Sequence, residues 1–106
     1  MSIRDDIGDH ALRLEGAWRD PAWDIEGDIF KTAKGKIFLI CAGDDRAAAV
    51  TLKLAADERT AALTLPFVRA ASWPRRWITA AITGETEREI ALEWVALSYA
   101  LVSSGR

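Results

Sequence analysis

Three short segments in the first half of the chain, separated by turn residues, constrain its fold most strongly. Residues 37–40 read Ile-Phe-Leu-Ile, a continuous apolar run typical of a central strand buried on both faces. Residues 49–54 alternate between apolar and polar side chains, which predicts a half-buried strand. Residues 28–32 precede both, and Gly35 can supply the positive φ that a tight hairpin requires. Together these segments predict an antiparallel meander of three strands.

Helical patterns flank this meander at both ends of the chain. From residue 3 to residue 14 the apolar side chains recur on one helical face, and Gly16 is placed to end that helix. At the other end, Thr86-Glu87-Arg88-Glu89 has the form of a capping box, with Thr86 as the N-cap. The helix that it opens carries an apolar stripe formed by Ile90, Trp94, Leu97 and Leu101.

The middle of the chain predicts a short helix and two further strands. Asp57 is a suitable N-cap for a helix that ends before Pro66. Strands are expected at residues 69–73 and 77–82, and Pro74 would pre-set the φ of a type I turn between them. The order α-β-β-β-α-β-β-α predicts an α+β fold of two layers: an antiparallel sheet of about five strands with the helices on one face.

The 106 residues suffice for one core, and no repeat or linker divides them, so residues 1–106 are predicted to form a single domain. The charged N-terminus favours the cytoplasm, and no apolar run approaches the length of a membrane span. Arg outnumbers Lys ten to four and Ala occurs 19 times, a usage typical of GC-rich bacterial genomes. We expect a monomer or a weak dimer that does not bind membranes.

Catalysis and metal binding are disfavoured by the scarcity of suitable side chains. Cys41 and His10 are the only residues of their types, and Cys41 ends an apolar strand, where a thiol behaves as a small hydrophobe. Asp24, Glu26 and Asp28 alternate along a segment, but a solvated edge strand explains them better than a cation site. The chain is therefore expected to have no enzymatic activity, no metal and no cofactor.

Charge is unevenly distributed along the chain. Residues 1–30 hold three Arg against eight acidic residues, a balance of −5. Residues 31–76 hold nine Lys and Arg against four acidic residues, a balance of +5, and residues 77–106 hold two Arg against four Glu, a balance of −2. This order predicts one basic face on an otherwise acidic molecule, with evenly scattered solvated charge as the alternative.

Several short motifs resemble those of the MmcQ/YjbR family. The segment from Phe30 to Phe38 resembles its F-x-V-x-G-K-x-F strand pair with one extra residue before the glycine. Residues 50–53, 77–78 and 98–102 resemble its L-x-L-K, W-V and S-Y-x-L-V motifs, in the same order. The P-G phrase after the short helix and the W-G-x-P phrase before the first strand are altered here. The resemblance implies a fold like that of small secretion-chaperone domains, DNA binding through two β-hairpin wings, and no catalytic residues.

Basic side chains lie close to tryptophans in this sequence, which makes nucleic-acid binding the most specific functional hypothesis. Cationic side chains contact phosphates, and an indole stacks on an unpaired base. The candidate nucleic-acid or anion-binding residues are Lys31, Lys34, Lys36, Lys53, Arg69, Arg75, Arg76, Trp73 and Trp77. Against this hypothesis stand the net charge of −2 and the isoelectric point near 5.4. Two alternatives stay open: a core role for the tryptophans with solvated turn cations, or a module that binds a protein partner or a small ligand. Exposure of Trp73 and Trp77 would favour a binding surface.

Overall fold

A computed structural model describes residues 2–21, 27–43 and 46–104 of the chain. Within these residues, six strands form one antiparallel sheet in the order β1-β2-β3-β4-β6-β5. The strands are β1 (Trp18–Asp20), β2 (Asp28–Lys31), β3 (Ile37–Gly43), β4 (Ala48–Leu52), β5 (Val68–Ala70) and β6 (Ile78–Ile82). The helices are α1 (Ile3–Leu12), α2 (Ala56–Ala62) and α3 (Glu85–Ser103). The α+β fold predicted from the sequence is confirmed.

The strand β1 was not expected, because the segment around Pro21 has the composition of a loop. Its three residues pair with β2, from Trp18 opposite Lys31 to Asp20 opposite Ile29. A strand this short shows no alternation in the sequence, and a position at the edge of a sheet tolerates both its brevity and the following proline. The sheet therefore has one strand more than the five expected.

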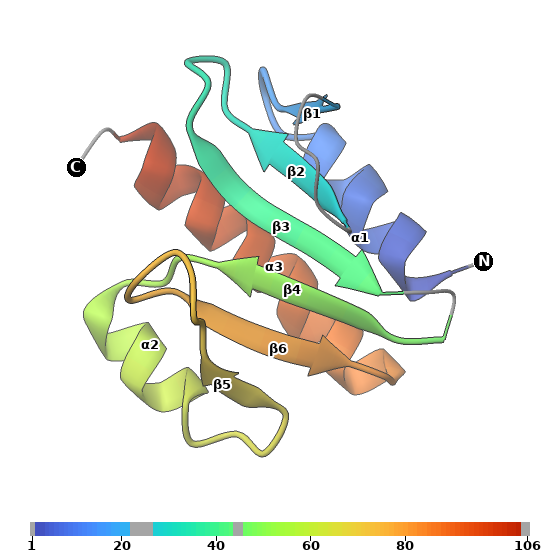
Figure 1. Cartoon of the computed structure of the whole chain (residues 1–106), viewed down its shortest axis with the longest axis vertical. Coiled ribbons are helices and arrows are strands. Elements are labelled where there is room, and N and C mark those ends of the chain that lie inside the picture. Colours follow the sequence, from blue (N-terminus) through green and yellow to red (C-terminus); the bar gives the residue numbers. More distant parts are fainter. Residues whose placement is uncertain (1, 22–26, 44–45, 105–106) are drawn as a thin grey trace.

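The core lies between one face of the sheet and the helices α1 and α3, which lie behind the sheet in Figure 1. Cross-strand neighbours on this face, such as Leu39, Leu52 and Ile78, are completely buried. The opposite face carries Thr51 beside Thr79, whose hydroxyl oxygens lie 2.8 Å apart. No helix crosses this second face in the view of Figure 1, and the loop between β5 and β6 lies over part of it. We call it the open face.

The strand β3 contains an additional residue. Leu39 pairs with Phe30 and Ile37 pairs with Lys31, so Phe38 has no partner on β2. Such a bulge turns consecutive side chains toward the same face. Phe38 and Leu39 are both completely buried, and the Phe38 ring meets Tyr99 of α3 edge to face at a centroid distance of 5.3 Å.

The buried stripe of α3 differs from the one expected. Its buried residues are Ala91, Trp94, Val95, Ser98 and Val102. Ile90 and Leu97 are only partly buried at the margin of the core, so the centre of the stripe is rotated from the predicted one. Ala91 and Ser98 are small, so a prediction based on large apolar side chains does not include them. Their small size allows the helix to approach the sheet closely.

Two helix starts were also predicted at the wrong residues. The N-cap of α2 is Ala55, so Asp57 lies in the first turn, where its charge still favours the helix dipole. The N-cap of α3 is Gly84 rather than Thr86. The Glu87 carboxylate turns back toward this start and accepts a 3.5 Å hydrogen bond from the Thr83 hydroxyl.

Helices α1 and α3 run side by side in the same direction. At their N-terminal ends Arg88 contacts Asp6 at 3.4 Å, and beyond the end of α1 the Tyr99 hydroxyl donates to the carbonyl oxygen of Glu15. Ser2 caps α1 by accepting a hydrogen bond from the amide of Asp5 at 2.9 Å. Because of this shared direction, the negatively charged starts of both helices meet at one end of the molecule.

Candidate nucleic-acid interface

The register of the sheet brings the basic segments of the chain to one end. Leu39 near the start of β3 pairs with Leu52 at the end of β4, and Leu52 pairs with Ile78 at the start of β6. Ala70 at the end of β5 pairs with Ile78 as well. The β2–β3 hairpin, the residues after β4 and the β5–β6 loop therefore leave the sheet at the same end, on the left in Figure 1.

Six cationic side chains lie at this end, which we call the basic end: Lys34, Lys36, Lys53, Arg69, Arg75 and Arg76. In the described part of the chain none of them forms an ion pair. All except Lys53 are exposed, and Lys53 is half-buried. Their positive charge is therefore available to a ligand.

The other end of the sheet differs in its electrostatics. Arg88 contacts carboxylates of Asp6, Glu85 and Glu89 at 3.4–3.6 Å, and Arg4 contacts Asp28 at 3.3 Å. Arg4 and Arg88 are thus neutralised by acidic neighbours. Among the residues that the structure describes, Arg4 and Arg88 at this end are paired, whereas the six cations of the basic end form no ion pair. This arrangement agrees with the predicted basic face.

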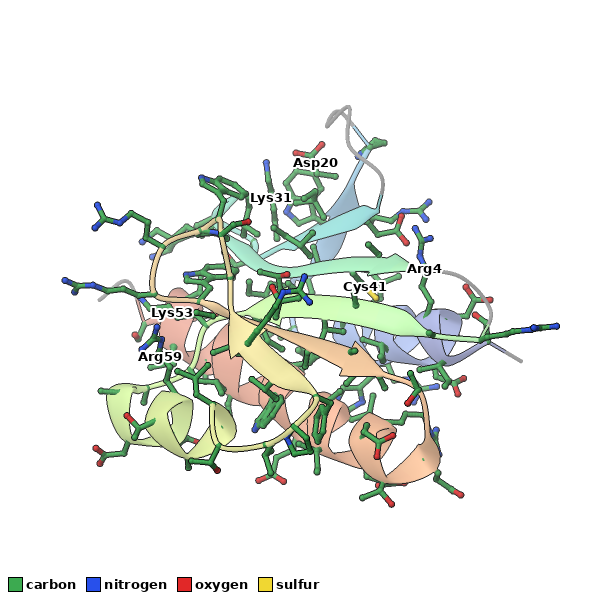
Figure 2. The ribbon with its side chains drawn as sticks, turned by 60° about the horizontal axis from the view of Figure 1, so that its bottom comes forward. Arg4, Asp20, Lys31, Cys41, Lys53 and Arg59 are labelled. Carbon is green, nitrogen blue, oxygen red and sulfur yellow. The ribbon has the colours of Figure 1, made fainter. Side chains whose placement is uncertain are left out.

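Lys31 also lies at the hairpin end of β2, but it differs from the six cations because it forms an ion pair. Its ammonium nitrogen lies 2.5 Å from a carboxylate oxygen of Asp20 and 5.5 Å from the ring centre of Trp18. Only 15% of its side chain is exposed. Lys31 therefore joins β1 to β2, and its labelled position beside Asp20 can be followed in Figure 2.

The β5–β6 loop carries the two candidate tryptophans. Trp73 is 54% exposed, whereas Trp77 is half-buried. The amide of Trp77 donates to the Pro74 carbonyl at 3.3 Å, so the hydrogen-bonded turn begins at Pro74 and Arg76 occupies its third position. Arg76 has φ +69°, which suits a type II turn rather than the expected type I turn. The Trp73–Pro74 peptide is cis. The strand predicted for residues 69–73 ends at Ala70, because this turn takes the chain out of the sheet.

One cation near the basic end was missed in the sequence. Arg59 belongs to α2, and Figure 2 shows it on the same side of the molecule as Lys53. Its Nε atom is buried and has no hydrogen-bond partner among the described residues. The sequence does not single out Arg59 as a binding residue, because it follows Asp57 and Glu58 and the three together are typical of a solvated helix surface.

The potential catalytic residues lie in unsuitable surroundings. Cys41 is completely buried, and this burial raises the pKa of its thiol to about 12, so the nucleophilic thiolate is disfavoured. Asp28 pairs with Arg4 and Arg19 at the start of β2, and β2 is an inner strand rather than the edge expected for this segment. Asp24 and Glu26 lie outside the described residues. Among residues 2–21, 27–43 and 46–104, no three His, Cys, Asp or Glu side chains gather as metal ligands. None of the helices described is long and apolar enough to span a membrane.

Solved structures share this arrangement of sheet and helices. A Deinococcus radiodurans protein with a DUF419 domain superposes with a TM-score of 0.77 at 18% sequence identity, over 93% of this chain and 77% of that one. A Pseudomonas syringae protein superposes with a TM-score of 0.67 at 18% identity, over 95% of this chain and 98% of that one. At this identity the likeness defines the fold class.

The YjbR family model matches residues 12–101. The chain belongs to the YjbR family, and the resemblance found in its motifs is confirmed. No curated protein matches the chain.

Proposed function

We propose that this YjbR domain binds single-stranded nucleic acid through the basic end. The single observation that carries the proposal is the convergence on one end of the sheet of six cations that form no ion pair with any residue the structure describes. Phosphate contacts by Lys and Arg supply most of the affinity of such sites. A net charge of −2 does not oppose this, because a phosphate responds mainly to charges within about one Debye length, roughly 8–10 Å.

The spacing of the cations supports contact with several phosphates at once. The strands β3 and β6 are separated only by β4, so the hairpin and the β5–β6 loop lie two strand spacings apart, about 10 Å. Lys53, the first residue after β4, lies between them. A strand of nucleic acid laid across the sheet end would meet Lys36, Lys53 and Arg75 in turn.

Trp73 favours a single strand over a duplex. Its indole is 54% exposed and lies two residues from Arg75. An indole can stack on an unpaired base, and such stacking adds about 1–3 kcal/mol per base with little preference for sequence. A base-paired duplex does not offer that face. We therefore propose recognition by charge and stacking, without base-specific contacts.

We propose no enzymatic role. The thiol of Cys41 is buried and held protonated by its raised pKa, which supports a binding domain rather than one that uses a cysteine nucleophile. The alternative of a protein-interaction module is an outcome of the experiment below.

The test is fluorescence anisotropy of a labelled 20-nucleotide single-stranded DNA of mixed sequence, with the matching duplex beside it. If four of the six cations contact phosphates, the slope of log K against log salt is about −3 for a single strand. Affinity should then fall about fiftyfold between roughly 50 and 200 mM salt. Absence of binding at the lower salt concentration would remove nucleic acid and leave a protein partner as the better explanation.

A further inference from the structure

A cavity of about 310 Å³ opens between the β2–β3 hairpin and the C-terminal end of α3. Three segments that are distant in sequence form its walls. They are Glu15 and Gly16 after α1, residues 32–34 with Lys36 in the hairpin, and Tyr99, Val102 and Ser103 of α3. The volume is within the range of small-molecule sites, about 300–1,000 Å³. The cavity lies toward the helices, whereas the β5–β6 loop with Arg75 and Arg76 lies toward the open face.

Hydrogen bonds and close packing hold these walls in place. Thr32 and Lys36 are joined by a backbone hydrogen bond of 2.8 Å, and the Lys36 amide also donates to the Thr32 hydroxyl at 3.3 Å. The Tyr99 hydroxyl donates to the carbonyl oxygen of Glu15 and so links α3 to the turn after α1. A Cβ atom on Gly16 would lie only 2.9 Å from that of Ala33, so this turn is pressed against the hairpin. The walls of the cavity are therefore held in place by contacts within the protein itself.

The lining combines cations with an apolar wall. Lys34 and Lys36 form no ion pair in the part of the chain that the structure describes, and Glu15 supplies the single carboxylate of the lining, so the lining carries a net charge of +1. Val102 and the Ala33 methyl group supply apolar surface. Because one positive charge is unbalanced, the lining suits a monoanion better than a neutral molecule or a multiply charged phosphate.

We infer that this cavity binds a small carboxylate with an apolar ring, its carboxylate facing Lys34 and Lys36 and its ring against Val102. This site goes beyond the proposed nucleic-acid surface, because most of its lining lies outside the basic end. The two sites share Lys34 and Lys36, so a bound carboxylate would reduce the charge available to a phosphate strand there.

The test uses two compounds of nearly equal size, of which one is an anion and the other is neutral. The protein labelled with ¹⁵N is titrated with 1-naphthaleneacetate and, separately, with the neutral 1-naphthaleneacetamide, while the backbone amide signals are followed by NMR. We expect saturable shifts at Ala33 and Ser103 with the acid, and binding at least about fivefold weaker with the amide. Equal affinity for the two compounds, or shifts centred elsewhere, would overturn the proposal.

Variants of the lining give effects of opposite sign. K34Q/K36Q should weaken binding of the acid about fivefold, whereas E15Q should tighten it about twofold, because each exposed charge contributes modestly. Ser103→Trp should fill the cavity and abolish the shifts, while Ser104→Trp, which is outside the lining, should leave them. R75Q/R76Q should also leave them, which separates this site from the nucleic-acid surface. Unchanged binding by Ser103→Trp would contradict the assignment even if DNA binding were established.

Discussion

The hydroxyl of Ser98 donates a 2.7 Å hydrogen bond to the carbonyl oxygen of Phe38 at the point where β3 and β4 separate. The Ser98 hydroxyl oxygen in turn accepts a 3.0 Å hydrogen bond from the amide of Lys53. Continuation of the β3–β4 register from Leu39 and Leu52 would pair Phe38 with Lys53 directly. Ser98 therefore replaces a ladder hydrogen bond with a bridge from α3, and it fixes the backbone from which Lys53 projects.

Ser98→Ala should lower the free energy of unfolding by about 2–3 kcal/mol, because it leaves the buried Phe38 carbonyl and the partly buried Lys53 amide without this partner. Denaturant melts measure this loss. Ser104→Ala is the matched control, since Ser104 is exposed and its hydroxyl donates to the Leu101 carbonyl one turn earlier in the chain. The control should cost less than about 0.5 kcal/mol. A loss below about 1 kcal/mol for Ser98→Ala would show that the bridge is dispensable.

Trp94→Ala should lower the free energy of unfolding by about 3–5 kcal/mol, the usual cost of deleting a large buried aromatic side chain. Trp94 is 9% exposed and stacks on Phe67 at a ring distance of 6.3 Å. Trp73→Ala provides the comparison, because its ring is 54% exposed and should contribute less than about 1 kcal/mol. Similar losses in the two variants would mean that the core is wrongly assigned.

Cys41 should resist thiol reagents in the folded protein. Burial raises its pKa from 9.0 to about 12, so the folded state keeps the thiol protonated where the unfolded state has lost its proton. The resulting contribution to stability is complete below about pH 9 and is lost as the pH rises toward 12. Ellman's reagent at pH 8 should react only after denaturant is added. Rapid reaction in native buffer would contradict the burial of this thiol.

The sequence contained enough information for most elements because their signals are local. The apolar run at residues 37–40 and the positive φ of Gly35, observed at +84°, depend on neighbouring residues alone. The strand β1 depends instead on pairing with β2, and the buried face of α3 depends on small residues such as Ser98 that meet the sheet closely. The pairing of β1 and the buried face of α3 therefore depend on contacts between distant residues, which form only in the folded chain.

The residues of the candidate site, too, could be predicted where the signal was local and not where it depended on the fold. Exposed turn cations such as Arg75 were recognisable from their neighbours, but their convergence with Lys36 and Lys53 follows from the strand order, which the sequence does not contain. Lys31 looked equivalent to Lys34 in the sequence, yet the unexpected β1 supplies Asp20 to neutralise it. The cavity beside α3 was not foreseen, because it requires three distant segments to meet.

Trp73→Ala should weaken binding of single-stranded DNA about five- to fiftyfold, given about 1–3 kcal/mol per stacked base, and should leave the salt slope unchanged. Duplex binding should change far less, since its bases are not available for stacking. Trp18→Ala is a comparison variant, because Trp18 is 39% exposed but lies on β1 against Lys31. Equal losses for single strand and duplex would remove stacking from the account.

The most direct measurement compares two variants of equal net charge. R75Q/R76Q removes two positive charges from the basic end, and R46E changes the net charge by the same amount at the opposite end of the sheet, in the turn between β3 and β4. Anisotropy with single-stranded DNA is recorded over a series of salt concentrations for both proteins. The account predicts that R75Q/R76Q makes the salt slope shallower by about 1.4, or about 0.7 for each lost phosphate contact, whereas R46E leaves the slope at its original value. Identical slopes in the two variants would contradict a nucleic-acid site at the basic end.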